Sequence, residues 1–177
     1  MITSAEGLPG RSLLLSCLVA AGMGACGGER PQEGPRPGAP LPAYAATTLD
    51  GDSVALASFR GRPVLLNLWA TWCAPCRHET PFLQSLYEQH RDQGFVIVGV
   101  SMDTADQAEA VREFIQEFGV TYPILHDRRM VGMDTFRVLG LPASFLIDRE
   151  GILRWMRYGP VSENDEEFLT ALEDVLQ

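Results

Sequence analysis

The sequence predicts an α/β fold in which a central mixed sheet carries helices on both faces. Two runs, VLLNLWA at 64–70 and FVIVGV at 95–100, are almost entirely apolar, which is typical of strands buried on both faces. Each run is followed by a segment with helical periodicity, and strands that alternate with helices favour a layered sheet. The 177 residues are enough for one domain with a real core and some additional sequence.

The first 25 residues have the pattern of a signal peptide. Arg11 provides a positive flank, and the uncharged apolar run 13–25 is too short to span a bilayer comfortably. The run ends in MGAC, which resembles the lipobox of bacterial lipoproteins, although leucine is more usual than methionine at its first position. We therefore expect lipid attachment at Cys26, with an ordinary signal cut after Gly22 as the alternative. Both interpretations place the mature protein outside the cytoplasm, in the periplasm or cell envelope.

Residues 26–42 are rich in glycine and proline and contain almost no apolar side chains. Such a segment cannot bury enough surface to offset the entropy that ordering would cost. We expect an extended tether that reaches about 40–50 Å or, in the plainer interpretation, a disordered terminus. A folded domain is then predicted for residues 43–177.

The first half of this domain combines two short strands, one buried strand and a helix. The short strands are expected at 44–48 and 53–56, on either side of an Asp-Gly-Asp turn. The helix after 64–70 has Pro75 in its first turn, where proline is tolerated, and Pro81 inside it, where we expect a kink. Its buried face is made by apolar residues at helical spacing, namely Phe82, Leu83, Leu86 and Tyr87.

The second half begins with the buried strand at 95–100 and an amphipathic helix at 104–118. Thr104 is the expected N-cap of this helix, and Gly119 is its expected C-terminal stop. The remaining predicted elements are strands at 122–125, 143–147 and 152–158 and helices at 128–136 and 164–176.

The charge and composition exclude several classes of function. A net charge of −9 argues against nucleic acid as a partner, because phosphate contacts need a basic surface. All 14 basic residues are arginine. The absence of lysine excludes Schiff-base chemistry, a lysine general base and a Walker-type phosphate site.

The only cysteines in the predicted domain are Cys73 and Cys76, a C-x-x-C pair at the start of a helix. Unpaired amides and the helix dipole favour a thiolate at that position, so we expect Cys73 to be the nucleophile. Cys76 lies on the same helix face and can close a disulfide with Cys73. This arrangement suits dithiol–disulfide exchange through a mixed disulfide that Cys76 resolves.

The pair has three other interpretations: a zinc site, a copper site and an inert disulfide. The number of available ligands bears on the first two, and the length of the closed loop bears on the third. A structural zinc site needs two further ligands, and the available histidines, His78, His90 and His126, form no second cluster in the sequence. A copper site is harder to exclude, because two thiolates and one histidine suit copper. An inert disulfide would close so short a loop that it would add little stability.

Beyond these local patterns, LLNLWATWCAPC resembles the thioredoxin superfamily. CAPCRHETP, a downstream GLPASFLID and an upstream Asp-Gly turn resemble the TlpA/ResA/CcmG-like branch, which consists of membrane-anchored extracytoplasmic thiol–disulfide oxidoreductases. The resemblance covers about residues 43–177 and implies a thioredoxin-like fold. The helix and strand at 104–125 match the central insertion of this branch.

The resemblance implies roles for two further positions. Pro142 matches the family's cis-proline, which packs against the disulfide and helps to hold a substrate strand. Leu141 and Ala143 depart from the residues that are common beside this proline, so the fine substrate preference does not follow from the family. Glu79 matches an acidic residue near the cysteines and is a candidate to accept the proton of Cys76. An exposed glutamate that interacts with the helix dipole is the alternative for Glu79.

Asn67 strengthens the case for Glu79, because it stands where cytoplasmic-type thioredoxins carry a buried aspartate. Pro75 between the cysteines matches the reducing members of the superfamily. Trp72 is expected to shield the disulfide and contact partners, although a packing role is also open, and Trp69 fits such a packing role better.

Together these features predict an enzyme that reduces protein disulfides, with apocytochrome during cytochrome c maturation as one possible client. The resemblance implies electrons from a membrane thiol reductase and no bound cofactor. The alternatives are a copper-binding or metallochaperone protein and a peroxide-reducing protein on the same fold. Against the peroxide-reducing alternative, Ala70 occupies the position where that family usually has threonine or serine.

Overall fold

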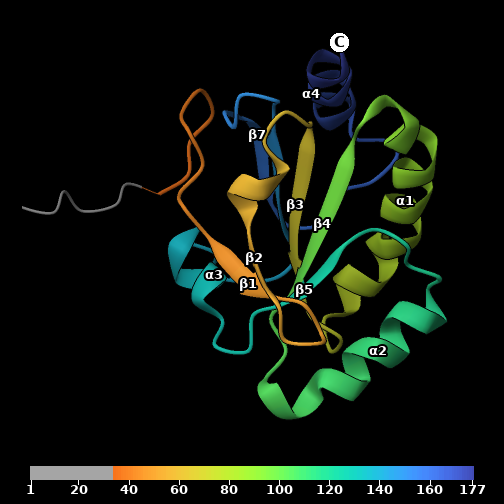
Figure 1. Ribbon diagram of the computed structural model, residues 1–177. Helices are drawn as coiled ribbons and strands as arrows, with labels where there is room; N and C mark the ends of the chain where they lie inside the picture. Colours follow the sequence, from red (N-terminus) through yellow and green to blue (C-terminus); the bar gives the residue numbers. More distant parts are fainter. Residues whose placement is uncertain (1–33) are drawn as a thin grey trace, which may run out of the picture. The chain divides into compact units, whose positions relative to one another are not determined.

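A seven-stranded mixed sheet organises residues 34–177, the part of the chain that the computed structural model describes (Figure 1). The strand order is β2–β1–β5–β4–β3–β6–β7. The expected signal segment and Cys26 lie outside the described residues. The strands are β1 Ala45–Thr47, β2 Ser53–Ala55, β3 Val64–Trp69, β4 Val96–Ser101, β5 Ile124–His126, β6 Ala143–Ile147 and β7 Leu153–Tyr158.

Strand β3 lies between β4 and β6 and is buried along its whole length. It runs parallel to β4, where Leu66 faces Val98, and antiparallel to β6, where Leu66 faces Phe145. Successive side chains point to opposite faces, so Leu66 and Leu65 belong to two different core clusters. The continuous apolar run is therefore explained by burial on both faces, as predicted.

In the part of the chain that the structure describes, four α-helices cover this sheet, and Figure 1 shows α1 and α3 on opposite faces. Leu83 and Leu86 of α1 and Phe168 of α4 pack with Leu65 on one face. Phe136, at the end of α3, packs with Leu66 on the other face. The predicted fold class is confirmed. The helices are α1 Ala74–His90, α2 Ala108–Glu117, α3 Val131–Thr135 and α4 Glu166–Leu176, with short 3-10 turns η1 Leu56–Phe59, η2 Arg91–Gln93 and η3 Ala105–Gln107.

The insertion between β4 and α3 contributes one helix and one strand. Thr104 forms a capping box with Gln107 at the start of η3, whereas α2 itself begins at Ala108 with Gln107 as its N-cap, so Thr104 caps the 3-10 turn ahead of the predicted helix. Strand β5 is parallel to β4 and ends where His126 faces Ser101. The strand predicted at 122–125 begins and ends too early, since β5 spans Ile124–His126. The prediction relied on apolar residues, and the buried strand ends in a polar histidine.

The boundary between tether and domain, predicted at residue 43, is corrected by the structure. The amide of Gly38 donates to the carbonyl of Leu153 (2.8 Å), and the amide of Leu153 donates to the carbonyl of Ala39 (2.9 Å). Pro40 forms an antiparallel bridge with Ile152. Residues 38–41 thus cover an outer edge of the sheet, where their backbone groups find hydrogen-bond partners, and Leu41 packs against the core cluster that contains Leu66.

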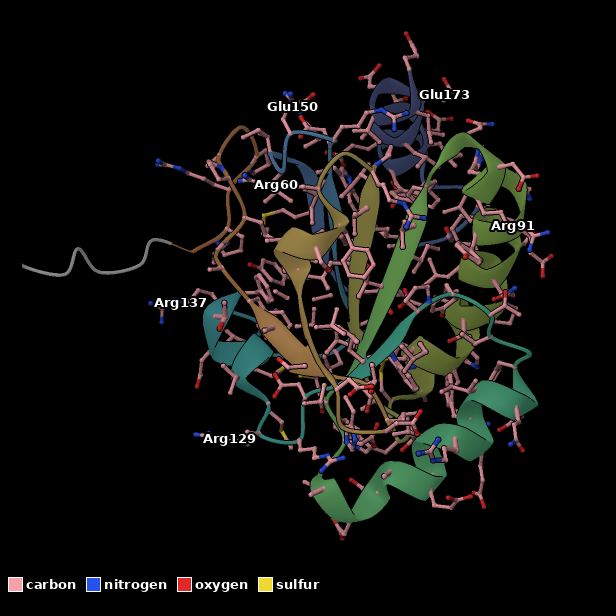
Figure 2. The ribbon with its side chains drawn as sticks, viewed as in Figure 1. Arg60, Arg91, Arg129, Arg137, Glu150 and Glu173 are labelled. Carbon is pink, nitrogen blue, oxygen red and sulfur yellow. A yellow bond between two sulfur atoms is a disulfide. The ribbon has the colours of Figure 1, made fainter. Side chains whose placement is uncertain are left out.

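Charged side chains project from many elements of the domain rather than from one stripe. In Figure 2 the labelled Arg91, Arg129 and Arg137 come from three separate segments and point outward. Within residues 34–177, no helix has the length and hydropathy needed to cross a membrane.

Candidate active site

Cys73 and Cys76 form a disulfide at the start of α1. Cys73 is the N-cap residue, and its Sγ accepts a hydrogen bond from the amide of Cys76 at 3.2 Å. Cys73 is 5% exposed and Cys76 is fully buried. The outer position and the amide contact suit Cys73 as a thiolate nucleophile when the pair is reduced, and burial suits Cys76 as the resolving thiol.

An apolar shell surrounds the disulfide. Trp69, Val111 and Phe114 pack with both cysteines in one cluster, and the Trp69 and Phe114 rings lie 4.3 Å apart. Trp69 therefore has the packing role expected of it. Leu141 is partly buried against the same cluster, and the Leu141–Pro142 peptide bond is cis, as the family resemblance implied. The loop before β6 is thus brought against the cysteine pair.

Two exposed apolar side chains lie on the segments that lead to Cys73 and to the cis-proline. Trp72, directly before Cys73, is 63% exposed, so the alternative in which it packs in the core is wrong. Leu139, two residues before Leu141, is fully exposed. The sequence reasoning missed Leu139, although an isolated leucine next to Gly140 in a loop was a visible signal. Pro75 lies in the first turn of α1, as predicted, and is exposed.

Glu79 is buried on α1, with only 3% of its surface exposed. Its Oε1 accepts a hydrogen bond from Nδ2 of Asn67 (2.9 Å), and its Oε2 accepts one from the amide of Val161 (2.9 Å). Asn67 also donates to Oγ of Ser144 at 3.0 Å. The alternative of an exposed glutamate at the helix start is therefore wrong. Asn67 and Glu79, linked in the sequence analysis only by their family positions, are in direct contact.

Burial raises the pKa of Glu79 to about 7, although the hydrogen bonds from Val161 and Asn67 act in the opposite direction. Burial also raises the pKa of Tyr122, and the charge of Glu79 adds to that effect. A carboxyl group with a pKa near neutrality can both take up and release a proton at physiological pH. The environment of Glu79 thus suits proton transfer better than a fixed charge.

A second buried carboxylate, Asp103, supports the turn before the cysteines, and the sequence analysis did not identify it. Asp103 follows β4 and accepts hydrogen bonds from the amide and the hydroxyl of Thr71 and from the hydroxyl of Ser101. His126, considered earlier as a metal ligand, has its Nε2 2.8 Å from the carbonyl oxygen of Asp103. The residues of 34–177 contain no group of three or more His, Cys, Asp or Glu arranged to hold a metal ion.

Comparison with known proteins agrees with this geometry. Residues 37–156 match the AhpC/TSA family. The chain is 33% identical over 133 residues to the thiol-disulfide oxidoreductase ResA of Bacillus thuringiensis subsp. konkukian, a match that covers 75% of this chain and 76% of the relative. It is 31% identical over 140 residues to the thioredoxin-like protein YneN of Bacillus subtilis, covering 78% and 81% of the two chains.

A solved structure shares the architecture as well. The thiol:disulfide interchange protein of the thioredoxin family from Chlorobium tepidum superposes with a TM-score of 0.67 at 28% identity, and the match covers 82% of this chain and all of the other. The sheet and the cysteine pair of this chain therefore fit relatives that are named as thiol-disulfide oxidoreductases and thioredoxin-family proteins. The chain belongs to the AhpC/TSA family and is a thioredoxin-like relative of the thiol-disulfide oxidoreductase ResA.

Proposed function

We propose that this protein is an extracytoplasmic thiol–disulfide oxidoreductase that reduces disulfides in protein clients. The observation that carries the proposal is the Cys73–Cys76 disulfide at the start of α1, with Cys76 buried and Glu79 buried one helical turn further on. Together these residues provide a nucleophile, a resolving thiol and a proton acceptor.

The reaction starts from the reduced dithiol. The Cys73 thiolate attacks one sulfur of a client disulfide, the client's sulfur–sulfur bond breaks, and a mixed disulfide with Cys73 forms. The departing client thiolate takes a proton from solvent. Glu79 accepts the proton of Cys76, and the resulting thiolate attacks Sγ of Cys73. The client leaves with its second thiolate, having gained two electrons, and the Cys73–Cys76 disulfide is restored.

The surface beside the disulfide supports a protein client rather than a small molecule. Trp72 and Leu139 present exposed apolar side chains, and Leu141 extends this apolar character into the cluster around the cysteines. Exposed aromatic and aliphatic groups beside a reactive centre are typical of protein-binding surfaces. An extended client segment would bury them while its own disulfide approaches Cys73.

The direction of electron flow and the location are inferred from sequence. Pro75 between the cysteines and the resemblance to ResA-like proteins support a reductase that is recharged by a membrane thiol reductase. The signal pattern at 1–25 and the lipobox-like MGAC support export and lipid attachment at Cys26. Residues 26–37, ahead of the segment paired with β7, would then separate the domain from the membrane. Apocytochrome during cytochrome c maturation is one candidate client.

The test uses the full chain and single cysteine variants. Reduced wild-type protein should reduce insulin disulfides, and Cys73→Ser should lower the rate to that of the uncatalysed reaction. Cys76→Ser should accumulate a mixed disulfide between Cys73 and the client, because the resolving thiol is missing. Exchange activity that survives the loss of Cys73 would reject the mechanism.

A peroxide-reducing activity is the second candidate, because the matched family model is that of AhpC/TSA. It is distinguished by measuring hydrogen peroxide consumption by the reduced protein in parallel with insulin reduction. Rapid peroxide turnover with slow insulin reduction would favour the second candidate over the first.

A further inference from the structure

Asp103 is a fully buried carboxylate at the end of β4, close in space to the turn that leads into the cysteines. It accepts a hydrogen bond from the amide of Thr71 (3.0 Å to Oδ2) and another from the Thr71 hydroxyl (2.6 Å to Oδ1). The hydroxyl of Ser101 donates to Oδ2 at 2.8 Å. A buried carboxyl group is tolerated only when such donors replace water, and three donors from two residues surround this one.

The residue that Asp103 holds is next to the reactive part of the chain. Thr71 precedes Trp72 and Cys73, and the amide of Cys73 donates to the carbonyl of Ala70 at 3.1 Å, which closes a tight turn. Asp103 binds this turn through both main-chain and side-chain groups of Thr71. Movement of Thr71 would therefore displace the exposed Trp72 and the N-cap residue Cys73 together.

The support for Asp103 comes from two neighbouring strands. The amide of Met102 donates to the carbonyl of Trp69 at 2.7 Å, which continues the pairing of β3 with β4 up to Asp103. On the other side, Nε2 of His126 in β5 contacts the carbonyl oxygen of Asp103. The inserted strand β5 thus helps to fix the position from which Asp103 holds the turn.

We propose that Asp103 is a positioning residue for disulfide exchange. Through Thr71 it keeps Cys73 at the helix N-terminus, where the amide of Cys76 faces Sγ, and it keeps Trp72 projecting beside the disulfide. The proposal deepens the proposed function and rests on it for its catalytic consequence. A carboxylate is required because it accepts from three donors, whereas an amide has one acceptor oxygen and would direct its own N–H groups toward them.

The test compares Thr71→Val and Asp103→Asn with a matched control, Thr104→Val, in the full-length protein. Thr71→Val removes the hydroxyl donor and keeps the backbone amide. Thr104→Val makes the same change in the residue after Asp103, where the hydroxyl belongs to the capping box of η3 and contacts Asp106 and Gln107 instead of the turn before Cys73. Each reduced protein is assayed for the rate of Cys73 alkylation by iodoacetamide against pH, for kcat and KM with insulin, and for thermal stability.

We expect Thr71→Val to lower the exchange rate about 3- to 10-fold and Asp103→Asn to lower it by about tenfold or more. In both variants the pH profile of alkylation should move, because Cys73 is displaced from the helix N-terminus. Thr104→Val should leave both readouts unchanged. If Thr71→Val and Asp103→Asn lose stability but keep the wild-type alkylation profile and exchange rate, Asp103 is only a structural support and the proposal is wrong.

The alkylation readout separates this proposal from the proposed function. Wild-type protein that fails to reduce insulin would reject the proposed function, whereas a shifted alkylation profile in Thr71→Val would still show that Asp103 positions Cys73. An unshifted profile in an otherwise active enzyme would reject the positioning role alone.

Discussion

Two buried carboxylates lie close to the cysteine pair, and they differ in how they are held. Glu79 on α1 receives one hydrogen bond on each oxygen, from Asn67 and from the amide of Val161. Asp103 after β4 receives hydrogen bonds from both donors of Thr71 and from Ser101. Glu79 contacts a side-chain amide and a distant loop, whereas Asp103 binds the turn that carries Trp72 and Cys73.

The difference separates two tasks that the same chemical group can perform. The pKa of Glu79 is raised to about 7 because burial outweighs its two hydrogen bonds. A group in that state is suited to take the proton of Cys76 and return it. Asp103 uses its acceptors to connect strand ends to the turn, which suits it to hold geometry. Substitutions at the two positions should therefore change different measurements.

The largest expected effect concerns Glu79 and exchange itself. Glu79→Gln removes the proposed proton acceptor, and general-base catalysis typically contributes about 100-fold or more. We expect the reduction of insulin to slow by about that factor at pH 7, and the thiol pKa values of the reduced pair to shift. Thiol titration curves and exchange rates that match the wild type would exclude Glu79 from proton transfer.

The next effect is on the pH dependence of the free energy of unfolding. The ordinary pKa of 4.5 applies to Glu79 in the unfolded chain, and the folded value is about 7. Between these values the folded protein retains a proton that the unfolded chain has released. The free energy of unfolding contributed by this site therefore falls as pH rises from about 4.5 to 7, by about 2–3 kcal/mol, and levels off above pH 7.

This pH dependence is measured by urea unfolding of the oxidised protein at pH 5 and pH 8. Glu79→Gln should lack the decrease attributed to the site, whatever its absolute stability. Glu88→Gln, an exposed glutamate on the same helix, is the matched control and should keep the wild-type dependence. Identical pH dependence in wild type and Glu79→Gln would contradict the raised pKa.

The smallest expected effect concerns Trp72, on the turn that Asp103 holds, and the binding of the client. Because Trp72 lies on that turn, Trp72→Ala should raise KM for a protein client, as a substitution of Asp103 would. It should not change the dependence on pH in the way that Glu79→Gln does. We expect KM for insulin to rise about 5-fold, with little change for a small aromatic disulfide. Ser85→Ala, a change at an exposed position of α1, provides a surface control. An equal loss with both substrates would place Trp72 in the chemistry rather than in client binding.

Much of the fold could be predicted because its signals are local. The apolar runs at 64–70 and 95–100 correspond to β3 and β4, and the amphipathic pattern at 104–118 corresponds to η3 and α2. The errors occur where pairing with distant residues decides the outcome. Residues 38–41 end a stretch rich in glycine and proline, yet their backbone pairs with 151–153. Composition alone cannot show that a free sheet edge is available.

The candidate site divides in the same way. Cys73 and Cys76 were identified from spacing, and Pro142 from its family position. Leu139 and Asp103 were missed, because exposure of a loop leucine and burial of an aspartate after a strand depend on what surrounds them. Glu79 was identified as a candidate, but its burial was not, since that depends on Asn67 and Val161.

The alternation of strands and helices, the redox spacing of the cysteine pair and its place at a helix start can all be read from the amino-acid sequence, because each follows from periodicity or spacing over a few residues. The folded chain was needed to find that Glu79 is buried with a raised pKa, that Asp103 accepts hydrogen bonds from the turn before Cys73, and that Trp72 and Leu139 face solvent. Burial and hydrogen bonding of these groups depend on segments up to 82 residues apart in the chain, which come together only on folding.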